Sequence, residues 1–282
     1  MVGQGDNTKH INDFLSAKIM HDTDKAWSKW GVRDPYYAVL TSEEYRGVCL
    51  SDEKRNKFFQ TGQQHFDHVL ATIRAHLDPR FNPTSAVDFG CGTGRVLVAM
   101  SQTCDKVLGI DISDSMLSEC LANCQAANVR NVTLKKSDDL LSALSGQYDL
   151  VHSFIVFQHI PRPRGEKMIP LLLKHLSHNG VAVLHFVYGW DANVCQRMAY
   201  FTRHHIPLAH TLANRLRGRH VNDPKMQMNI YDMNRLFRLI SEAGGRRIHV
   251  ELVRHGARRG VFFYFCNGKK PQSVEATASL IS

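Results

Sequence analysis

The stretch that decides the fold is Val87-Asp88-Phe89-Gly90-Cys91-Gly92-Thr93-Gly94-Arg95. It continues an apolar run at 86–89 that predicts a strand, and it leads into a segment, 95–103, that predicts a helix. Glycine at every second position allows positive φ angles and removes the side chains that would block a ligand. The N-terminus of the helix attracts the acidic part of a small molecule. The stretch therefore predicts an adenosyl ligand at the carboxyl edge of a parallel sheet.

Neighbouring residues distinguish between possible ligands of this turn. A dinucleotide fingerprint needs a third glycine where Arg95 stands, and the chain has no G-x-x-x-x-G-K-[ST] phosphate loop. Asp88 would repel a pyrophosphate but accept hydrogen bonds from a cationic amino group, which favours an amino-acid-bearing nucleoside. Asp111, followed by Ile112, ends a predicted strand at 106–111, where its carboxylate can accept both hydroxyls of a ribose. The alternative for Asp111 is a helix-capping acid.

Strands and helices alternate beyond the turn, which is typical of a parallel sheet with crossover helices. Further strands are predicted at 129–135, 148–155 and 181–187. Further helices are predicted at 113–127, where Ser113 is the N-cap, and at 163–177, which Asn179-Gly180 would end. A last helix is predicted at 231–243, with Met233, Leu236, Phe237 and Ile240 facing inward. Segments 246–254 and 260–266 predict an antiparallel hairpin that turns at 255–259.

Residues 1–80 predict an N-terminal helical lid, with helices at 11–20 and 53–77. Between them, Gly31 and Pro35 interrupt an aromatic cluster at 27–37, which predicts a loop. This loop is either a hydrophobic plug or a lid over the ligand. The second unit is a domain at 81–268 with an insertion at 189–228, rich in His and Arg, which we expect to build the substrate side of the site. Residues 269–282 predict a flexible tail.

Composition limits the compartment and the partners. The 282 residues carry a formal net charge of +9. This charge favours binding of nucleic acid, an anionic membrane or a phosphorylated substrate; the alternative is a basic surface without a specific partner. No run reaches the roughly 18 apolar residues of a membrane span, and residues 1–12 lack the apolar core of a signal peptide. Seven cysteines without a C-x-x-C pair argue against a disulfide framework or a zinc site. We expect a cytoplasmic protein with reduced thiols and no metal; nothing indicates its oligomeric state.

The series formed by 87–94, Gly109-Ile110-Asp111, Asp138 and Tyr148-Asp149-Leu150-Val151 resembles the motifs of class I S-adenosylmethionine-dependent methyltransferases. We expect an α/β fold: a seven-stranded, mostly parallel sheet with helices on both faces, the C-terminal antiparallel hairpin and the N-terminal helical lid. The resemblance implies the strand order 3-2-1-4-5-7-6, with strand seven antiparallel. It covers about 85–188, and more weakly the hairpin. Segment 30–40 is also similar to the N-terminal part of a bacterial methyltransferase subgroup that accompanies glycan or secondary-metabolite pathways.

The same resemblance implies S-adenosylmethionine as the cofactor and assigns residues to its parts. Gly90, Gly92 and Gly94 would pass under the methionine part, and Asp111 would hold the ribose. Asp138 would face the adenine, and Ser153 would lie near the sulfonium. The complete predicted set of cofactor-binding residues is Asp88, Gly90, Cys91, Gly92, Gly94, Asp111, Ile112, Asp138 and Ser153.

Methyl transfer to a hydroxyl requires an aligned acceptor and benefits from a general base. His159 follows the fourth predicted strand and is the candidate base; the alternative is that it caps or packs the junction between strand and helix. Tyr188 is a better candidate than His185 to line the substrate pocket, and a plain basic surface explains His204, His205 and His210 better than a metal site does. The predicted substrate residues are Tyr36, Tyr37, Gln158 and Tyr188.

Three functions remain open on the sequence alone. The leading hypothesis is a methyltransferase that acts on a small molecule, at a hydroxyl of a sugar, glycan precursor or secondary metabolite. The net charge suggests a nucleic-acid acceptor instead, but no Asn/Asp-Pro-Pro-Tyr/Phe segment follows the fourth strand. The third hypothesis is a non-catalytic module that keeps the cofactor-binding fold.

Overall fold

The computed structural model describes residues 23–268 except 48–49, 207 and 217. The predicted helix at 11–20 and the predicted tail at 269–282 lie outside the described residues.

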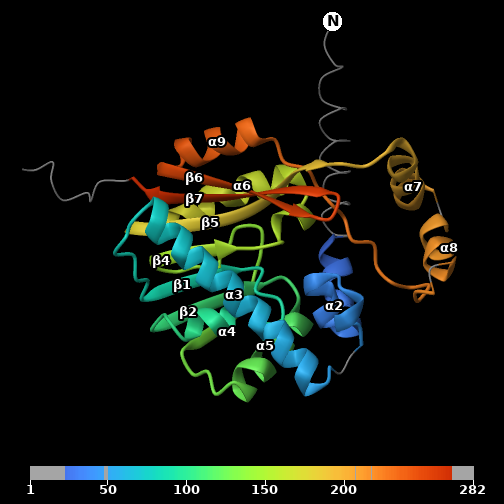
Figure 1. Ribbon diagram of the computed structural model, residues 1–282, viewed down its shortest axis with the longest axis horizontal. Coiled ribbons are helices and arrows are strands. Elements are labelled where there is room, and N and C mark those ends of the chain that lie inside the picture. The colour runs from blue at the N-terminus through green and yellow to red at the C-terminus, as the bar shows by residue number, and fades with distance from the viewer. Residues whose placement is uncertain (1–22, 48–49, 207, 217, 269–282) are drawn as a thin grey trace, which may run out of the picture.

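Seven strands form one twisted sheet in the order β3-β2-β1-β4-β5-β7-β6 (Figure 1). The strands are β1 (Ser85–Phe89), β2 (Lys106–Asp111), β3 (Val132–Lys136), β4 (Tyr148–Ser153), β5 (Leu176–Trp190), β6 (Gly245–His255) and β7 (Arg258–Asn267). The first five pair in parallel, whereas β7 is antiparallel to both β5 and β6. The predicted strand order and the closing hairpin are confirmed.

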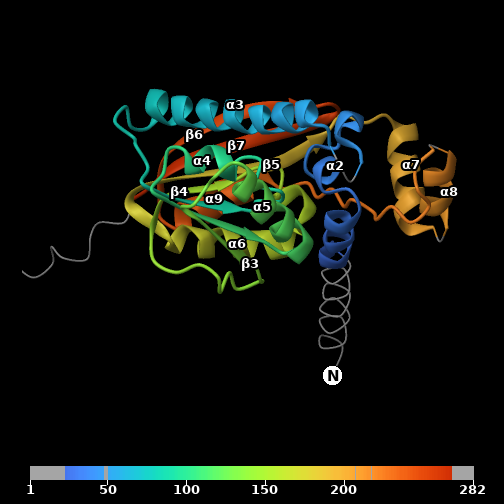
Figure 2. The ribbon, with the colours of Figure 1, turned by 90° about the horizontal axis from the view of Figure 1, so that it is seen from below.

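Helices cover both faces of the sheet, as predicted (Figure 2). On one face lie α3 (Asp52–His76), α4 (Leu97–Ser101) and α5 (Asp114–Ala126), whose apolar side chains form one core with the sheet. On the other lie α6 (Arg162–Lys174) and α9 (Met233–Glu242), which form the second core. Ser113 caps α5 as expected, because its Oγ accepts a hydrogen bond from Met116 N at 3.3 Å. The chain therefore buries two apolar layers around a sheet whose central strands are covered on both sides.

The predicted loop at 27–37 is wrong, because this segment is helical. Residues 23–33 form a helix, and α2 (Pro35–Leu40) follows after Asp34. Gly31 serves close packing instead of a turn: a Cβ there would lie 2.3 Å from Ser115 Oγ. Pro35 begins α2, where a missing backbone N–H costs nothing. A short 3-10 turn, η1 (Glu43–Tyr45), follows α2. We call the described residues 23–47, which correspond to part of the predicted N-terminal lid, the cap.

Several predicted boundaries also need correction. The helix predicted at 163–177 ends at Lys174, and β5 already begins at Leu176, so Asn179-Gly180 lies inside a strand and does not stop the helix. The strand begins early because Tyr148 N donates to His175 O and draws the chain into the sheet there. On α9, Phe237 is 37% exposed while Leu239 is buried in its place. β3 begins at Val132 instead of 129, and β4 ends at Ser153 instead of 155.

The insertion at 189–228 contains two helices, α7 (Val194–His205) and α8 (Ala209–Leu216). Both views place them beyond the edge of the sheet, next to α2 and the helix at 23–33 (Figures 1 and 2). The cap and the insertion therefore stand together at one end of the sheet. Within the described residues, no helix has the length and apolar character that a membrane crossing needs.

Candidate active site

The glycine turn adopts the backbone that its sequence predicts. Gly90, Gly92 and Gly94 have φ angles of +75°, +52° and +87°, a region that L side chains seldom occupy. A Cβ at Gly90 would lie 2.3 Å from Val156 Cγ2, and one at Gly92 would lie 3.0 Å from Val39 Cγ2. The turn therefore touches both the segment after β4 and the cap, and it has no room for side chains.

A cavity opens above this turn, at the carboxyl ends of β1, β2 and β4. It holds about 870 Å³ of empty space, part of which is open to solvent. Six of the predicted site residues line it: Gly90, Cys91, Gly92, Asp111, Ile112 and His159. The cap contributes Trp27 and Val39 to the wall, and the segment after β4 contributes Phe154, Ile155 and Val156.

Asp111 is held at the end of β2 by two backbone donors. Its Oδ2 accepts from Gly92 N at 2.9 Å, and its Oδ1 accepts from Ser113 N at 2.9 Å. Burial raises the pKa of the carboxyl to about 6, although these hydrogen bonds oppose the rise. Because it lines the cavity, the carboxylate can still receive donors from a ligand.

Four predicted cofactor residues do not line the cavity. Gly94 lies against Cys120, Ser153 donates its hydroxyl to Phe89 O at 3.0 Å, and exposed Asp138 accepts from Leu140 N and Ser142 N. The hydrogen bond from Ser142 N is the main reason that the pKa of Asp138 is lowered. Ser137, next to Asp138, lines the cavity instead.

Asp88, on β1, belongs to a buried row of hydrogen-bonded side chains that links the sheet to α3. Its Oδ1 accepts from His152 Nδ1 at 2.9 Å, and His152 Nε2 accepts from His65 Nε2 at the same distance. Burial keeps the pKa of His65 well below its usual value, so this ring is neutral. His65 stacks on Phe154, with ring centroids 4.1 Å apart, and Phe154 forms part of the cavity wall. Asp88 thus supports the wall and does not face the cavity.

None of the four predicted substrate residues lines the cavity. Tyr36 is buried and donates to Glu119 Oε1 at 2.6 Å, so it fastens the cap to α5. Tyr37 faces a second cavity, and Tyr188 packs against the core between α6, α9 and the sheet. Gln158 is buried beside His159. The structure does not bring these four residues together.

His159 lies at the cavity wall with both ring nitrogens engaged. Its Nδ1 donates to Gln227 O at 2.8 Å, and its Nε2 accepts from Gln158 Nε2 at 3.0 Å. Trp27 contacts the ring edge-on, with centroids 4.6 Å apart. Burial lowers the pKa of His159 to about 4. At neutral pH the ring is therefore an uncharged hydrogen-bonding group, and the lone pair on its Nε2 is occupied by the amide of Gln158.

Arg95 is a site residue that the sequence reasoning missed. Its side chain is buried, lines the cavity and lies over the ring of Phe154 at 5.3 Å. Within the described residues, its Nε has no hydrogen-bond partner. Desolvation lowers the pKa of Arg95 to about 10, which leaves it positive at pH 7. A buried cation with an open donor favours an anionic group in the cavity. The sequence had shown Arg95 only as a departure from the dinucleotide fingerprint.

A buried arginine fastens the cap over the cavity. Arg164, at the start of α6, contacts both carboxylate oxygens of Asp24, at 2.6 and 3.1 Å. Its Nε also donates to Asp139 Oδ1 at 2.6 Å. Asp24 and Arg164 both line the cavity, as does Trp27 one turn after Asp24. This contact between distant segments holds the wall that Trp27 forms; no signal in the sequence pointed to it.

Comparisons with known proteins agree with this geometry. Residues 86–180 match a family model described as a methyltransferase domain. A ribosomal protein L11 methyltransferase from Lactobacillus gasseri is 28% identical over 202 residues, which are 65% of this chain and 58% of that protein. A ubiquinone biosynthesis O-methyltransferase from Acinetobacter baumannii is 32% identical over 79 residues, 27% of this chain and 33% of that protein. The chain thus spans less than two thirds of these relatives.

Among solved structures, the magnesium protoporphyrin IX methyltransferase from Synechocystis PCC 6803, with bound SAH, has a TM-score of 0.57. The match covers 87% of this chain and 100% of that one at 18% identity. At this identity the likeness concerns the fold, and it includes strands outside the segment that the family model matches.

Proposed function

We propose that the chain transfers a methyl group from S-adenosylmethionine to a small molecule, because residues 86–180 match a methyltransferase domain model and the fold resembles that of a solved methyltransferase. The single observation that carries the proposal is the cavity itself. Its floor is a glycine turn without room for side chains, one edge is the Asp111 carboxylate, and a buried Arg95 guanidinium with an open donor lies in its wall.

The residues present fit this cofactor part by part. Asp111 would accept hydrogen bonds from the ribose hydroxyls, and Arg95 would pair with the carboxylate of the methionine part. Gly90 and Gly92 would let the backbone approach that part closely. Ile112 and Ser137 would lie at the base. When bound, S-adenosylmethionine would supply an electrophilic methyl group, and the protein would align the acceptor and exclude water. Asp138 and Ser153 stay predictions at the adenine and sulfonium ends.

For the acceptor, we propose a hydroxyl of a sugar, glycan precursor or secondary metabolite. The cap supports a small acceptor, because Trp27 stands over the cavity and Arg164 fastens its helix to the body. Ile155, at φ +62°, is a non-glycine residue in a strained conformation on the wall, a feature that gathers at functional sites. The cytoplasm remains the proposed compartment, since the described cysteines are all free thiols.

We keep His159 as the proposed partner of the acceptor hydroxyl. A neutral imidazole can take the hydroxyl proton on Nε2 after Gln158 releases it. Replacing His159 by Asn is expected to lower kcat by roughly tenfold, less than for a general base with a pKa near neutrality, because a ring of pKa about 4 is a weak base. Cofactor binding should change little, because Asp111 and Arg95 remain. Because the pKa of His159 is about 4, its titration should leave the rate flat from pH 6 to 9. An unchanged kcat in the variant would assign His159 to packing alone.

Opening the cap should weaken cofactor binding. Replacing Arg164 by Ala leaves Asp24 and Asp139 without their cation and frees the helix that carries Trp27. We expect the Kd of S-adenosylhomocysteine to rise roughly tenfold, because the loss of the charge-assisted contacts of Arg164 loosens the helix that carries Trp27 over the cavity. The matched control is Arg162→Ala on the same helix, an exposed residue that contacts only Glu166 among the described ion pairs. Equal Kd values for both variants would contradict a role for the cap.

A second candidate acceptor is a protein, because the relative that matches 65% of this chain is named a ribosomal protein methyltransferase. The net charge of +9 keeps nucleic acid as a further alternative. One experiment separates them: methyl-labelled S-adenosylmethionine is incubated with the enzyme and with hydroxylated sugars and metabolites, ribosomal proteins, or RNA. The proposal expects label in a small molecule. Label in protein or in RNA would show that the acceptor is a protein or a nucleic acid instead of a small molecule. If no fraction led to formation of S-adenosylhomocysteine, the result would favour a non-catalytic module.

A further inference from the structure

A second cavity lies between the cap and the insertion. It has about 710 Å³ of empty space, part of it open to solvent, and it shares no lining residue with the cavity described above. Its wall combines flat aromatic side chains with cations, notably Trp30, Tyr37, Tyr200, Arg219, Lys225 and Arg258. We propose that this second cavity is a binding site for a phosphate-bearing ring compound, independent of the methyl-transfer site.

The charge of the wall favours an anion. Three cationic side chains line the cavity, against the single carboxylate of Asp223. That carboxylate is already neutralised, because Arg33 Nε lies 2.8 Å from its Oδ1 and Arg46 Nη1 lies 3.7 Å from its Oδ2. Its backbone carbonyl is occupied as well, since His210 Nε2 donates to it at 2.7 Å. Arg219 is paired with Glu43 at 3.1 Å, so the positive charge that the wall offers to a ligand comes mainly from Arg258.

Arg258 is the cation best placed to receive a phosphate. It stacks over Trp190 at 4.0 Å from the ring centroid, which holds the plane of the guanidinium. Within the described residues, it forms no ion pair with a carboxylate, although its neighbours Arg254 and Arg259 both contact Asp191. Desolvation lowers the pKa of Arg258, as it does for a partly buried cation that lacks a counter-ion. A phosphate would supply the missing charge in a geometry that suits the guanidinium.

Trp30 provides the second, independent observation. It is 3% exposed, it lines the cavity, and its Nε1 has no hydrogen-bond partner among the described residues. An indole N–H can only donate, and a buried donor without a partner costs about 1–3 kcal/mol. An oxygen of a ligand would satisfy it. The half-buried ring of Tyr200 also lines the cavity and offers an apolar face on which a sugar or a base can lie.

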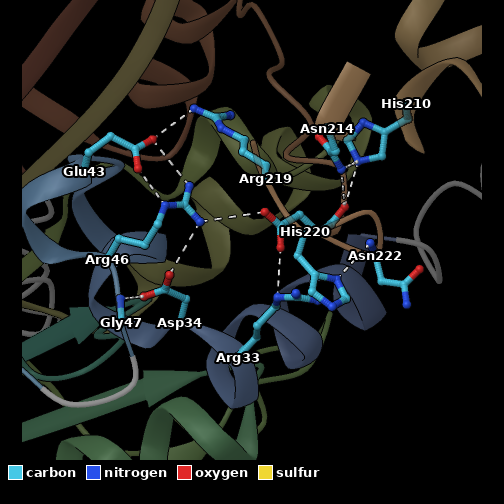
Figure 3. A network of polar contacts seen from close by, with 11 residues as sticks. Arg33, Asp34, Glu43, Arg46, Gly47, His210, Asn214, Arg219, His220 and Asn222 are labelled. Atoms are coloured by element: carbon cyan, nitrogen blue, oxygen red, sulfur yellow. Dashed lines mark hydrogen bonds and ion pairs between the residues drawn. The ribbon is translucent and has the colours of Figure 1, made fainter. Parts of the chain in front are cut away.

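A network of ion pairs fixes the shape of the site before a ligand arrives (Figure 3). Glu43 joins Arg46, at 2.6 Å, to Arg219 of the insertion, at 3.1 Å. Arg46 also lies over the ring of Tyr37, 3.7 Å from its centroid. Because these contacts link the cap to the insertion, both walls are held in place. A preorganised site loses less free energy to ordering when it binds.

The test is a titration of the full chain, saturated with S-adenosylhomocysteine, with four probes in low salt. ADP and glucose 6-phosphate carry both a ring and a phosphate, inorganic phosphate lacks the ring, and adenosine lacks the phosphate. Binding is followed by calorimetry and by tryptophan fluorescence, with Trp30→Phe to assign the signal. We expect one equivalent of ADP or glucose 6-phosphate to bind at least tenfold more tightly than phosphate or adenosine; which of the two binds identifies the ring as a base or a sugar.

Two arginines on the β6–β7 hairpin form a matched pair for this test. Arg258→Ala should weaken binding of the preferred probe roughly tenfold or more, as the loss of a charge-assisted contact predicts. Arg254→Ala removes an equal charge that does not line the cavity and should leave binding unchanged. The proposal is overturned if neither ring phosphate binds, if the two variants behave alike, or if S-adenosylhomocysteine competes with the probe. Because the readout is binding in this cavity, failure here would leave the methyl-transfer proposal standing.

Discussion

Replacing Asp111 by Asn is expected to weaken binding of S-adenosylhomocysteine by roughly 100-fold, because charge-assisted hydrogen bonds contribute about 1.5–3 kcal/mol each. The carboxylate has two oxygens that could each accept a ribose hydroxyl, whereas the amide keeps only one acceptor. An Asn oxygen can accept from Ser113 N as Asp111 Oδ1 does now, but the amide NH2 cannot accept from Gly92 N, so the turn loses one contact. Thermal unfolding of the variant therefore accompanies the binding measurement. Calorimetric titration at pH 7.5 measures the change.

The same residue predicts how binding depends on pH. In the ligand-free protein the pKa of Asp111 is about 6, and only the ionised carboxylate accepts two hydroxyl donors. Ligand binding then favours the ionised form, so affinity should be constant above pH 7 and fall as the pH drops through 6. By linkage, the Kd at pH 5 should be about tenfold higher than at pH 8. The Asp111→Asn variant should lose this dependence.

Asp114→Asn is the control for both effects. Asp114 is an exposed acid three residues away, at the start of α5, where it contacts Lys136. Its replacement removes the same charge without touching the cavity. If Asp114→Asn weakened the ligand as much as Asp111→Asn, or if the Kd of the unaltered protein did not change between pH 8 and 5, the assigned role of Asp111 would be wrong.

The second large effect is expected at Gly62, in the middle of α3. Alanine usually stabilises a helix by up to about 1 kcal/mol relative to glycine. Here a Cβ would lie 1.9 Å from the backbone oxygen of Arg95, where α3 crosses the end of the glycine turn. Backbone cannot move aside as a flexible side chain does, so Gly62→Ala should destabilise the protein by roughly 2–4 kcal/mol. It should also displace Arg95 and weaken cofactor binding.

Thermal and urea unfolding measure this prediction. A loss of this size should lower Tm by roughly 5–10 °C in a chain of this length. Gln64→Ala, on the same helix, should change Tm by little, because the side chain of Gln64 is exposed to solvent. A Gly62→Ala protein as stable as the original would show that α3 lies farther from the turn than described.

Local signals were strong enough to predict the sheet and one side of the site. The glycine turn, Asp111 and the C-terminal hairpin each depend on nearby residues, and each is found where the sequence placed it. Ser113 capped its helix for the same reason. Six predicted site residues meet at one cavity because parallel strands bring their carboxyl ends to a common edge.

Contacts between distant segments could not be predicted in this way. Gly31 suggested a loop, yet it allows a helix to pack on Ser115. Arg164 reaches Asp24 across 140 positions of sequence, and Arg95 was visible only as a missing glycine. Burial also changed the chemistry of predicted residues: it made His159 a neutral ring and gave Tyr36 a role in packing. Residue type indicated which side chains can bind a ligand or accept a proton, but only tertiary packing decides which of them face the cavity.

The most direct test is a crystal structure of the protein with S-adenosylhomocysteine. We predict the ligand in the cavity above Gly90–Gly94, with both ribose hydroxyls donating to Asp111 and the carboxylate of the homocysteine part paired with Arg95. A ligand bound elsewhere, or density at this cavity in which Asp111 and Arg95 contact no part of it, would contradict the proposed site.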